Sequence, residues 1–507
     1  MAEPLRKIKT GNSVASFLQE VFVNQKLNNW LGYFLIGGMA AIFAFLISKN
    51  LYLGLGFLGV VLGSLVLLGC LLDAELGLYL NMIYIFFVYF FVRLFFEDDF
   101  PLGVISDVLV SVTFLGLFVK NQNLKRNAAH FLKAKPVVFL LIAFGYLCLQ
   151  LLNPLAHSFE GWFSVIRKVL SSILVMFIAY SVFTDYKKIW RFLKVLFVCA
   201  LIAALYGCFQ QWHGLFGFEQ AWVRSNDVRF GLIFVGWNYR KFSVMSDPTA
   251  LGLIMASCAL LFIIIGLNER RTSSKAFLLG GALFMVLAMA YSGTRTANAM
   301  LVAGAGLFVL LSIQKKATKI FAFFAVLAFL FLMYAPIYNN ATIIRFRTSF
   351  SGSKNESYMV REENREAIQP YIYKHPFGGG LSTTGGNGEK YNPDHYLAGF
   401  PPDSGYLNKA LETGWVGLAI NCLLYFVTLL YAVKGFFRAK SNRIKTLFAA
   451  TAVFLFSFYL AELVQEAVGL IANMIIYNSI VAMIIRLREL STKEKDEWQQ
   501  EQMANSF

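Results

Sequence analysis

Two polar segments of this chain carry residue types that can bind an anion and move a proton. The first runs from Arg361 to Gly380 and holds two arginines four residues apart, a histidine followed by proline, and three consecutive glycines. The second runs from Asp403 to Gly417 and holds two carboxylates and three glycines. Guanidinium groups bind anions through a planar fork of donors, and carboxylates or imidazoles accept protons. We therefore expect the chemistry of this chain to lie in these segments.

The rest of the chain is predominantly apolar. Of its 507 residues, 58% are hydrophobic, 16% aromatic and 15% charged, which leaves too little polar surface for a soluble globular protein. Apolar runs of about 17 to 25 residues, the length needed to cross a bilayer, recur along the sequence. They lack the alternating pattern of a membrane barrel, so only helices can satisfy their backbone groups in lipid. The sequence predicts an all-α polytopic membrane protein with about 12–14 transmembrane helices.

These runs and the polar stretches between them predict the domain organisation. The predicted spans lie at 30–48, 51–72, 76–96, 101–119, 136–152, 165–184, 192–209, 249–267, 276–292, 296–313, 319–336, 414–434, 446–463 and 467–486. The predicted parts are an N-terminal segment 1–29, an N-terminal bundle 30–209, a polar loop 210–248, helices 249–336, a large polar loop 337–413, C-terminal helices 414–486 and a tail 487–507. Polar loops as long as these two are usually functional.

Basic residues gather in alternate connections between the predicted spans, which predicts the orientation of the chain. The basic connections are those near 120–135, 187–194, 270–275, 315–319 and 434–445. By the positive-inside rule these connections and both termini are cytoplasmic, and the two long loops face the outside. Most of the net charge of +16 has this origin, so we expect contact with the lipid bilayer and no binding of nucleic acid.

The larger polar loop, 337–413, contains the pattern of a helix. Ser353 and Glu356 have the spacing of a capping box, and apolar residues further along recur at helical intervals. The two arginines of the first polar segment would share one face of this helix. Pro370 is expected to end or kink the helix because proline lacks the backbone N–H and its ring clashes with the preceding turn.

The order of these motifs resembles the O-antigen ligase and O-antigen polymerase superfamily of bacterial envelope glycan enzymes. An arginine and a short helix precede a His-Pro-x-Gly-x-Gly turn at His375–Gly380, and a polar pair precedes Glu-x-Gly-x-x-Gly at Glu412–Gly417, which enters a span. Upstream, Tyr291–Arg295 and the pair Arg240-Lys241 occupy matching places. The resemblance covers about residues 240–434.

The chain also departs from this family in two ways. It has Asp403-Ser404 where the ligases commonly carry a His-Asn pair. It also has more predicted spans than ligases usually have, which suggests additional helices at the N-terminal end.

The resemblance implies a metal-independent glycosyltransferase of the C-type architecture, with no cofactor. It would move a glycan from undecaprenyl pyrophosphate to an acceptor at the periplasmic face of the bacterial inner membrane. The acceptor would be lipid A core in a ligase, another lipid-linked repeat in an O-antigen or exopolysaccharide polymerase, or a protein in a protein glycosylase. A flippase that transports lipid-linked oligosaccharide is the alternative from another class, although repeated halves and mid-membrane charges, typical of transporters, are not evident here.

The resemblance and the residue types together give the candidate site. The pyrophosphate candidates are Arg240, Arg295, Arg361 and Arg365, because arginine neutralises phosphate without being titrated. The base candidates are Asp403 and His395, with Asp394 nearby, and Arg361 is also counted as catalytic. The turn of the loop is formed by His375, Gly378 and Gly380.

Structural roles remain open for several of these residues. Arg295 has the position of an interfacial anchor, and Arg361 and Arg365 have acidic neighbours with which they can form surface ion pairs. His375 precedes proline, as a turn residue does, and Asp403 has the position of a cap for the helix that follows it.

No metal site is predicted. The six cysteines fall inside predicted spans without paired spacing, so neither a disulfide framework nor a metal cluster is indicated. The run Glu97-Asp98-Asp99 has the residue types of a carboxylate metal site, but no histidine or second carboxylate motif accompanies it.

Overall fold

The computed structural model describes residues 30–95, 102–120, 124–235, 238–338, 340–350 and 356–504. The segment 1–29, the run Glu97-Asp98-Asp99 and Ser353 of the predicted capping box lie outside these residues. The described part of the chain is almost entirely helical. Its one sheet is a hairpin in which β1 (Phe234–Val235) pairs with β2 (Asn238–Tyr239).

Each apolar run predicted as a span coincides with a helix. These helices are α2 (Trp30–Lys49), α3 (Leu51–Leu72), α4 (Ala74–Phe95), α5 (Leu102–Lys120), α7 (Lys135–Leu149), α8 (Phe159–Val182), α9 (Tyr186–His213), α12 (Pro248–Leu267), α13 (Thr272–Ser292), α14 (Arg295–Ser312), α15 (Lys316–Tyr334), α19 (Gly405–Arg438), α20 (Asn442–Ala461) and α21 (Ile471–Ala504). Among the described residues, ten helices are long and apolar enough to cross a membrane, and α2, α3 and α5 contribute shorter apolar stretches. The predicted all-α polytopic membrane fold is confirmed.

Polar caps make two of these helices start earlier than hydrophobicity alone predicts. The hydroxyl of Ser158 accepts the N–H of Gly161 at 3.1 Å where α8 begins, and the carboxylate of Asp185 accepts the N–H of Lys188 at 3.0 Å where α9 begins. Each cap provides an acceptor for a backbone donor that the first helical turn leaves without a partner.

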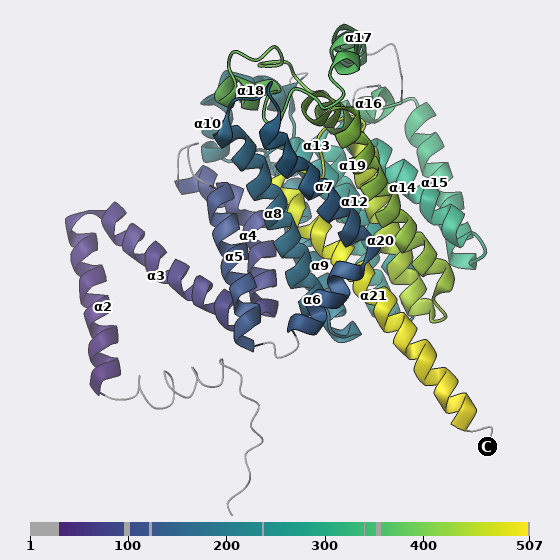
Figure 1. Ribbon diagram of the computed structural model, residues 1–507, viewed down its shortest axis with the longest axis horizontal. Coiled ribbons are helices and arrows are strands. Elements are labelled where there is room, and N and C mark those ends of the chain that lie inside the picture. The colour runs from purple at the N-terminus through teal and green to yellow at the C-terminus, as the bar shows by residue number, and fades with distance from the viewer. Residues whose placement is uncertain are drawn as a thin grey trace, which may run out of the picture.

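The shorter helices lie at the two ends of the bundle. Those at one end are α10 (Gly217–Arg224), α16 (Ala341–Thr348), α17 (Glu356–Lys374) and α18 (Gly385–Tyr391), whereas α6 (Leu124–Lys133) lies towards the other end (Figure 1). Two further short elements are η2 (Gln150–Leu152), which follows α7, and α11 (Asp227–Ile233), which follows α10. The two long polar loops therefore meet on one face of the bundle, which we call the loop face.

The helix predicted in the larger loop is present as α17, and Pro370 lies inside it rather than at its end. α17 does not end at this proline and continues to Lys374. Proline removes the helical hydrogen bond to the carbonyl of Glu366. Both residues are exposed, so water can satisfy that carbonyl and the helix can continue.

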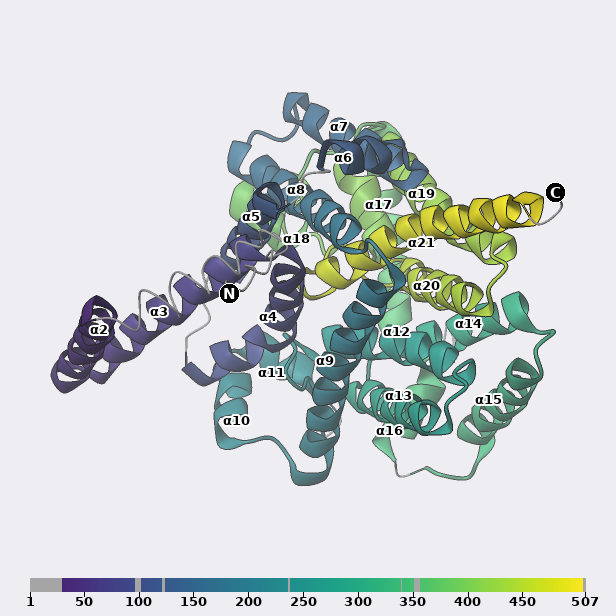
Figure 2. The same cartoon turned by 90° about the horizontal axis from the view of Figure 1, so that it is seen from below.

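The centre of the bundle is formed by α12 and α20. Of the most apolar stretch of each helix, 89% of α12 and 83% of α20 are buried, compared with 6% for α15 at the periphery. α12 packs against α9, α13, α14 and α20. α2 lies apart from the remaining helices and packs on α3, which packs in turn against α4 and α5 (Figures 1 and 2).

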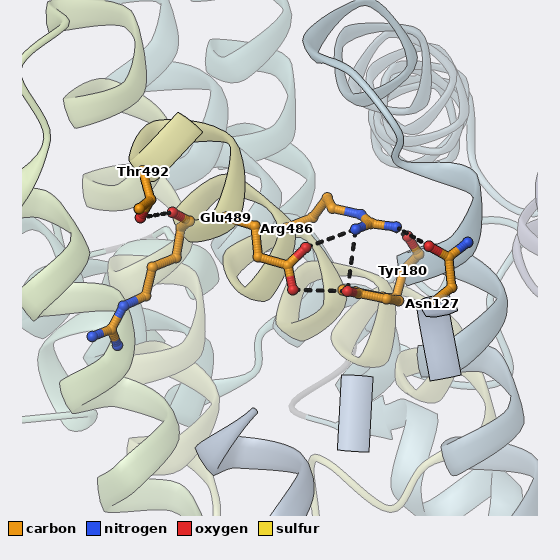
Figure 3. A network of polar contacts seen from close by, with 6 residues as sticks. Asn127, Tyr180, Arg486, Glu489 and Thr492 are labelled. Carbon is orange, nitrogen blue, oxygen red and sulfur yellow. Dashed lines mark hydrogen bonds and ion pairs between the residues drawn. The ribbon is translucent and has the colours of Figure 1, made fainter. Parts of the chain in front are cut away.

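A polar network fixes α21 at the face opposite the loop face (Figure 3). The Arg486 guanidinium lies 3.9 Å from the centre of the Tyr180 ring and donates to a Glu489 carboxylate oxygen at 2.7 Å. The Tyr180 hydroxyl donates to the other oxygen of Glu489, also at 2.7 Å, and Arg486 reaches Asn127 on α6 at 3.4 Å. α21 is thereby tied to both α8 and α6.

Candidate active site

The two polar segments singled out in the sequence are hydrogen-bonded to each other. The N–H of Gly379 donates to the carbonyl of Leu411 at 2.8 Å, and the N–H of Gly380 donates to the carbonyl of Glu412 at 2.9 Å. These carbonyls are free because α19 is interrupted at Gly414, whose φ of 67° and ψ of −170° are not helical. Gly378–Gly380, which we call the glycine turn, thus donates the hydrogen bonds that the broken helix does not make itself.

Close backbone packing explains why both segments of this contact carry glycine. A Cβ on Gly414 would lie 1.9 Å from the carbonyl oxygen of Pro376, and a Cβ on Gly378 would lie 2.5 Å from the backbone of Glu412. Both glycines also have positive φ, which other residues adopt at a cost. The N–H of Gly378 donates to the carbonyl of His375 at 2.9 Å. The N–H groups of Gly378, Gly379 and Gly380 thus bind protein carbonyls and are not available to a phosphate.

The C-terminal end of α7 and the residues that follow it hold this assembly in place. The Tyr146 hydroxyl donates to the carbonyl of Thr413 at 2.7 Å. The side-chain amide of Gln150 donates to the carbonyl of Phe377 at 3.0 Å, and that of Asn153 donates to the carbonyl of Gly378 at 3.1 Å. Three polar side chains of the N-terminal bundle therefore satisfy backbone groups on both sides of the contact.

Arg361 faces Asp403 across the gap between α17 and the start of α19. The Arg361 Nε lies 3.9 Å from one Asp403 carboxylate oxygen, and the Asn364 side-chain amide donates to the other oxygen at 3.2 Å. Asp403 does not cap α19, because the hydroxyl of Ser404 accepts the N–H of Leu407 at 3.0 Å and occupies the cap position. The carboxylate of Asp403 is therefore free to face α17.

Arg365, one turn further along α17, has a different environment. It donates to the backbone carbonyl of Leu463 at 3.2 Å and lies 3.9 Å from Glu362 on its own helix. The expected surface ion pair thus exists for Arg365, whereas Arg361 pairs with a residue of the second polar segment. Arg365 connects α17 to the turn that follows α20.

That turn contains a buried carboxylate which the sequence reasoning missed. One Glu462 oxygen accepts the N–H groups of Ala467 at 3.1 Å and Val468 at 2.6 Å. The other lies against Gly405, where a Cβ would be only 1.4 Å away. Burial raises the pKa of the Glu462 carboxyl to about 7, although the two N–H donors oppose this. The glycine after Asp403-Ser404 is thus required to admit this carboxyl group.

Three arginines form a second cationic group at the turn between α13 and α14. The Arg240 guanidinium donates to the carbonyls of Ser292 at 3.0 Å and Leu232 at 3.1 Å, and to the Thr294 hydroxyl at 3.1 Å. Arg345 donates to the carbonyl of Gly293 at 3.1 Å. The third member is Arg295, the first residue of α14. We call Arg240, Arg295 and Arg345 the arginine cluster.

The polar loop before α12 positions Arg240. The N–H of Arg240 donates to the carbonyl of Ile233 at 2.8 Å, at the open end of the β-hairpin. The N–H of Lys241 donates to the carbonyl of Tyr291 at 3.2 Å. These two backbone hydrogen bonds fix the position of the main chain at Arg240 and Lys241. Arg240 can then reach across to the end of α13.

The positive charge of the arginine cluster is only partly offset, by the charge of Asp247 near Arg240. The acceptors that hold Arg240 and Arg345 are neutral carbonyls and a hydroxyl, and within the described residues no salt bridge joins either to a carboxylate. Burial, followed by the neighbouring Arg345, lowers the pKa of Arg240 to about 10, and burial with the nearby Arg295 lowers the pKa of Arg345. An anion placed here would relieve this repulsion.

The turn after α20 links the arginine cluster to the Arg361–Asp403 pair. Thr296, next to Arg295, contacts Gln465 of that turn through their side-chain oxygens at 3.5 Å, and Leu463 of the same turn accepts from Arg365. The ends of α14, α19 and α20 at the loop face, together with α17, therefore converge around residues 462–468. Four of the predicted arginines belong to this region, together with Arg345.

His375 and His395 lie in a separate place, an open cleft of about 850 Å³ on the loop face. His375 stacks on Tyr371, with ring centres 4.1 Å apart, and Tyr371 stacks on Tyr396 at 5.3 Å. Burial, followed by the electrostatic effect of His375 and His157, lowers the pKa of His395 and so favours its neutral imidazole. Asp394 also lines this cleft, whereas Asp403 and Arg361 do not.

The sequence reasoning missed Arg345, Asn364 and Glu462. Arg345 lies on the short helix α16, which Asn340 caps, and this cap was the available indication of a helix carrying an arginine. Glu462 follows an apolar run and has the pattern of an ordinary helix end. In the described part of the chain, no group of three His, Cys, Asp or Glu side chains is arranged to hold a metal ion.

Comparison with known proteins gives one family match. Residues 280–422 match the family model described as O-Antigen ligase. This segment contains Arg295, Arg345, the helix α17 and the glycine turn, and it ends within α19, whereas Arg240 and Glu462 lie outside it. No curated protein matches the chain.

Proposed function

With residues 280–422 supporting its membership of the O-antigen ligase superfamily, we propose that this protein is a ligase-like glycosyltransferase of the bacterial inner membrane. It moves a glycan from undecaprenyl pyrophosphate to an acceptor at the periplasmic face, and it needs no metal ion. The acceptor is lipid A core or a growing polysaccharide. The donor, the acceptor and the sidedness are parts of this proposal.

The arginine cluster is the observation that carries the proposal. A lipid pyrophosphate is a multiply charged anion that stays at the membrane edge, and it leaves with additional negative charge as the glycosidic bond breaks. Preorganised cations placed where this charge develops lower the barrier, and such electrostatic stabilisation is usually the largest catalytic effect. Arg295 begins the spanning helix α14, and Arg240 and Arg345 donate to the carbonyls of Ser292 and Gly293 just before it, so the cluster lies at the end of a spanning helix, where such a headgroup would bind.

The residues near Asp403 supply the second half of the reaction. The acceptor hydroxyl must lose a proton while the sugar anomeric carbon is attacked, and a carboxylate within reach can accept it. We propose Asp403 for this role, with Arg361 holding its carboxylate and contacting the pyrophosphate as the donor binds. The cleft of His375, Tyr371 and Tyr396 lies on the same face and is suited to glycan that extends away from the reacting sugar.

The direct test is transfer by the purified full-length chain in liposomes. An undecaprenyl-pyrophosphate-linked glycan is supplied with lipid A core, or with lipid-linked glycan alone, and product and released undecaprenyl pyrophosphate are measured. We expect release to require an acceptor. Transfer to lipid A core identifies a ligase, and lengthening of the lipid-linked glycan identifies a polymerase. Movement of the donor across the bilayer without a covalent change would show that the protein is a flippase rather than a glycosyltransferase.

Two arginines of α17 provide a matched pair for the same assay. Arg361→Ala is expected to lower transfer by at least about a hundredfold, and Arg361→Lys should also be strongly impaired because a point charge does not reproduce the fork. Arg365→Ala removes the same charge one turn away and should retain a large fraction of the activity. Near-normal transfer by all three variants at equal expression would reject the role of Arg361.

A further inference from the structure

Two cavities on the face opposite the loop face are lined by basic residues that the proposed reaction does not use. The first, of about 610 Å³, includes Arg270, Lys315, Lys316 and Arg443. The second, of about 560 Å³, includes Lys187, Arg191, Lys194 and again Arg443. The cations come from four parts of the chain that are far apart in sequence: the N-terminal part of α9, the connection before α13, and the starts of α15 and α20. Folding therefore gathers basic connections that the sequence showed as separate.

Most of these cations are not neutralised by the protein. Arg191 pairs with Glu75 at 2.8 Å, and Lys315 donates to the neutral side-chain oxygen of Asn268 at 2.8 Å. For Arg270, Lys316, Arg443, Lys187 and Lys194, no ion pair with a carboxylate occurs among the described residues. The remaining acidic residue of the first cavity, Glu269, accepts the backbone N–H of Arg270 at 2.9 Å and that of Arg271 at 3.2 Å.

The surroundings of the cavities also favour an anion. Burial lowers the pKa of Lys315, and the charge of Lys445, a further cation near the first cavity, lowers it as well. α15 and α20 begin at the first cavity, and neither has a side-chain cap, so their backbone donors face the same space as the cations. Trp190 lines both cavities, and tryptophan is enriched where the hydrocarbon core meets the headgroups.

Trp190, Ser441 and Arg443 line both cavities, which are therefore adjacent. We propose that together they bind one acidic phospholipid with two phosphate groups, a diphosphatidylglycerol, from the leaflet at this face. One phosphate occupies each cavity, and Arg443 lies between the two. A lipid is favoured over a soluble anion because the cavities lie at the ends of spanning helices, where basic pockets between helices take lipid headgroups.

The test compares lipids bound to the full-length protein. Purified protein is incubated with diphosphatidylglycerol, phosphatidylglycerol or phosphatidylcholine, and bound lipid is counted by native mass spectrometry. We expect one diphosphatidylglycerol to remain bound in preference to the other two lipids. The double variant Lys194→Ala/Arg443→Ala should bind it about thirtyfold more weakly, because each cation near the lipid surface contributes about fivefold.

The matched control is the double variant Lys133→Ala/Lys135→Ala, which removes two exposed cations of the same face that line neither cavity. It should bind the lipid as the wild type does. An equal loss in both double variants, or equal retention of phosphatidylglycerol and diphosphatidylglycerol, would overturn the proposal. Thermal stabilisation by soluble pyrophosphate equal to that by diphosphatidylglycerol would assign the cavities to a soluble anion instead.

Discussion

Asp403 contacts an arginine and an amide of α17, and this environment makes one substitution decisive. If its carboxylate takes the acceptor proton, Asp403→Asn keeps the shape, loses the proton acceptor and lowers transfer by about 10² to 10⁴. Asp403→His should recover part of the activity, since imidazole also accepts a proton. The measurement is turnover of the purified variants with a lipid-pyrophosphate-linked donor.

The structure removes one competing explanation for this substitution. Because Ser404 caps α19, loss of a cap cannot account for an effect at Asp403. Ser404→Ala is the control for the cap and should affect thermal stability, by about 1 kcal/mol, more than turnover. Full activity of Asp403→Asn would move the base role to His395, whose lowered pKa favours the neutral imidazole, or to no side chain at all.

At the scale of residues, the sequence indicated which side chains could take part in the reaction better than it indicated which of them lie together in space. Arginines near the outer ends of predicted spans could be singled out because charge there needs a reason. That Arg240 joins Arg345 rather than Arg361 depends on how the loop before α12 folds back to Tyr291, and no spacing encodes this. His395 and Asp403 are close in sequence but belong to different parts of the loop face.

The broken helix α19 yields a prediction at the scale of elements. Gly414→Ala places a Cβ 1.9 Å from the carbonyl oxygen of Pro376 on a residue with positive φ. We expect a loss of roughly 2–5 kcal/mol in stability, because strain and overpacking add. Thermal aggregation of the detergent-solubilised protein should begin at a clearly lower temperature.

Gly386→Ala provides the control for this prediction. Gly386 belongs to the same loop, has no positive φ, and a Cβ there would meet nothing within 4 Å. It should leave thermal stability unchanged or slightly higher. Wild-type stability of Gly414→Ala would mean that the glycine turn and α19 are not packed as described.

Elements were predicted where hydrophobicity determines them and missed where tertiary contacts do. The spanning helices follow from apolar runs that must hydrogen-bond internally in lipid. The span predicted at 414–434 begins at the break in α19, but the donors that replace the broken helical bonds come from Gly379 and Gly380, and no spacing in the sequence indicates this. Pro370 illustrates the reverse, since exposure allows α17 to pass through it.

At the scale of the whole molecule, the predicted orientation in the membrane can be tested. In a variant without the native cysteines, Gly386→Cys and Asp227→Cys should react with a membrane-impermeant thiol reagent added from the periplasmic side, whereas Asn442→Cys should not. All three positions are exposed, so reactivity reports sidedness rather than burial. Labelling of Asn442→Cys without labelling of Gly386→Cys would reverse the orientation and reject the periplasmic site.

The contacts made by the end of α7 have a consequence for the time course of synthesis. Tyr146 and its partner Thr413 are 267 residues apart. Ribosomes add roughly 5–20 residues per second, so the hydroxyl emerges on the order of 10 to 50 s before its acceptor exists. Gln150 and Asn153 wait nearly as long for residues 377 and 378. The N-terminal helices must therefore be inserted with this edge still hydrated, and the contact between the end of α7 and α19 is completed only when α19 has been made, late in synthesis.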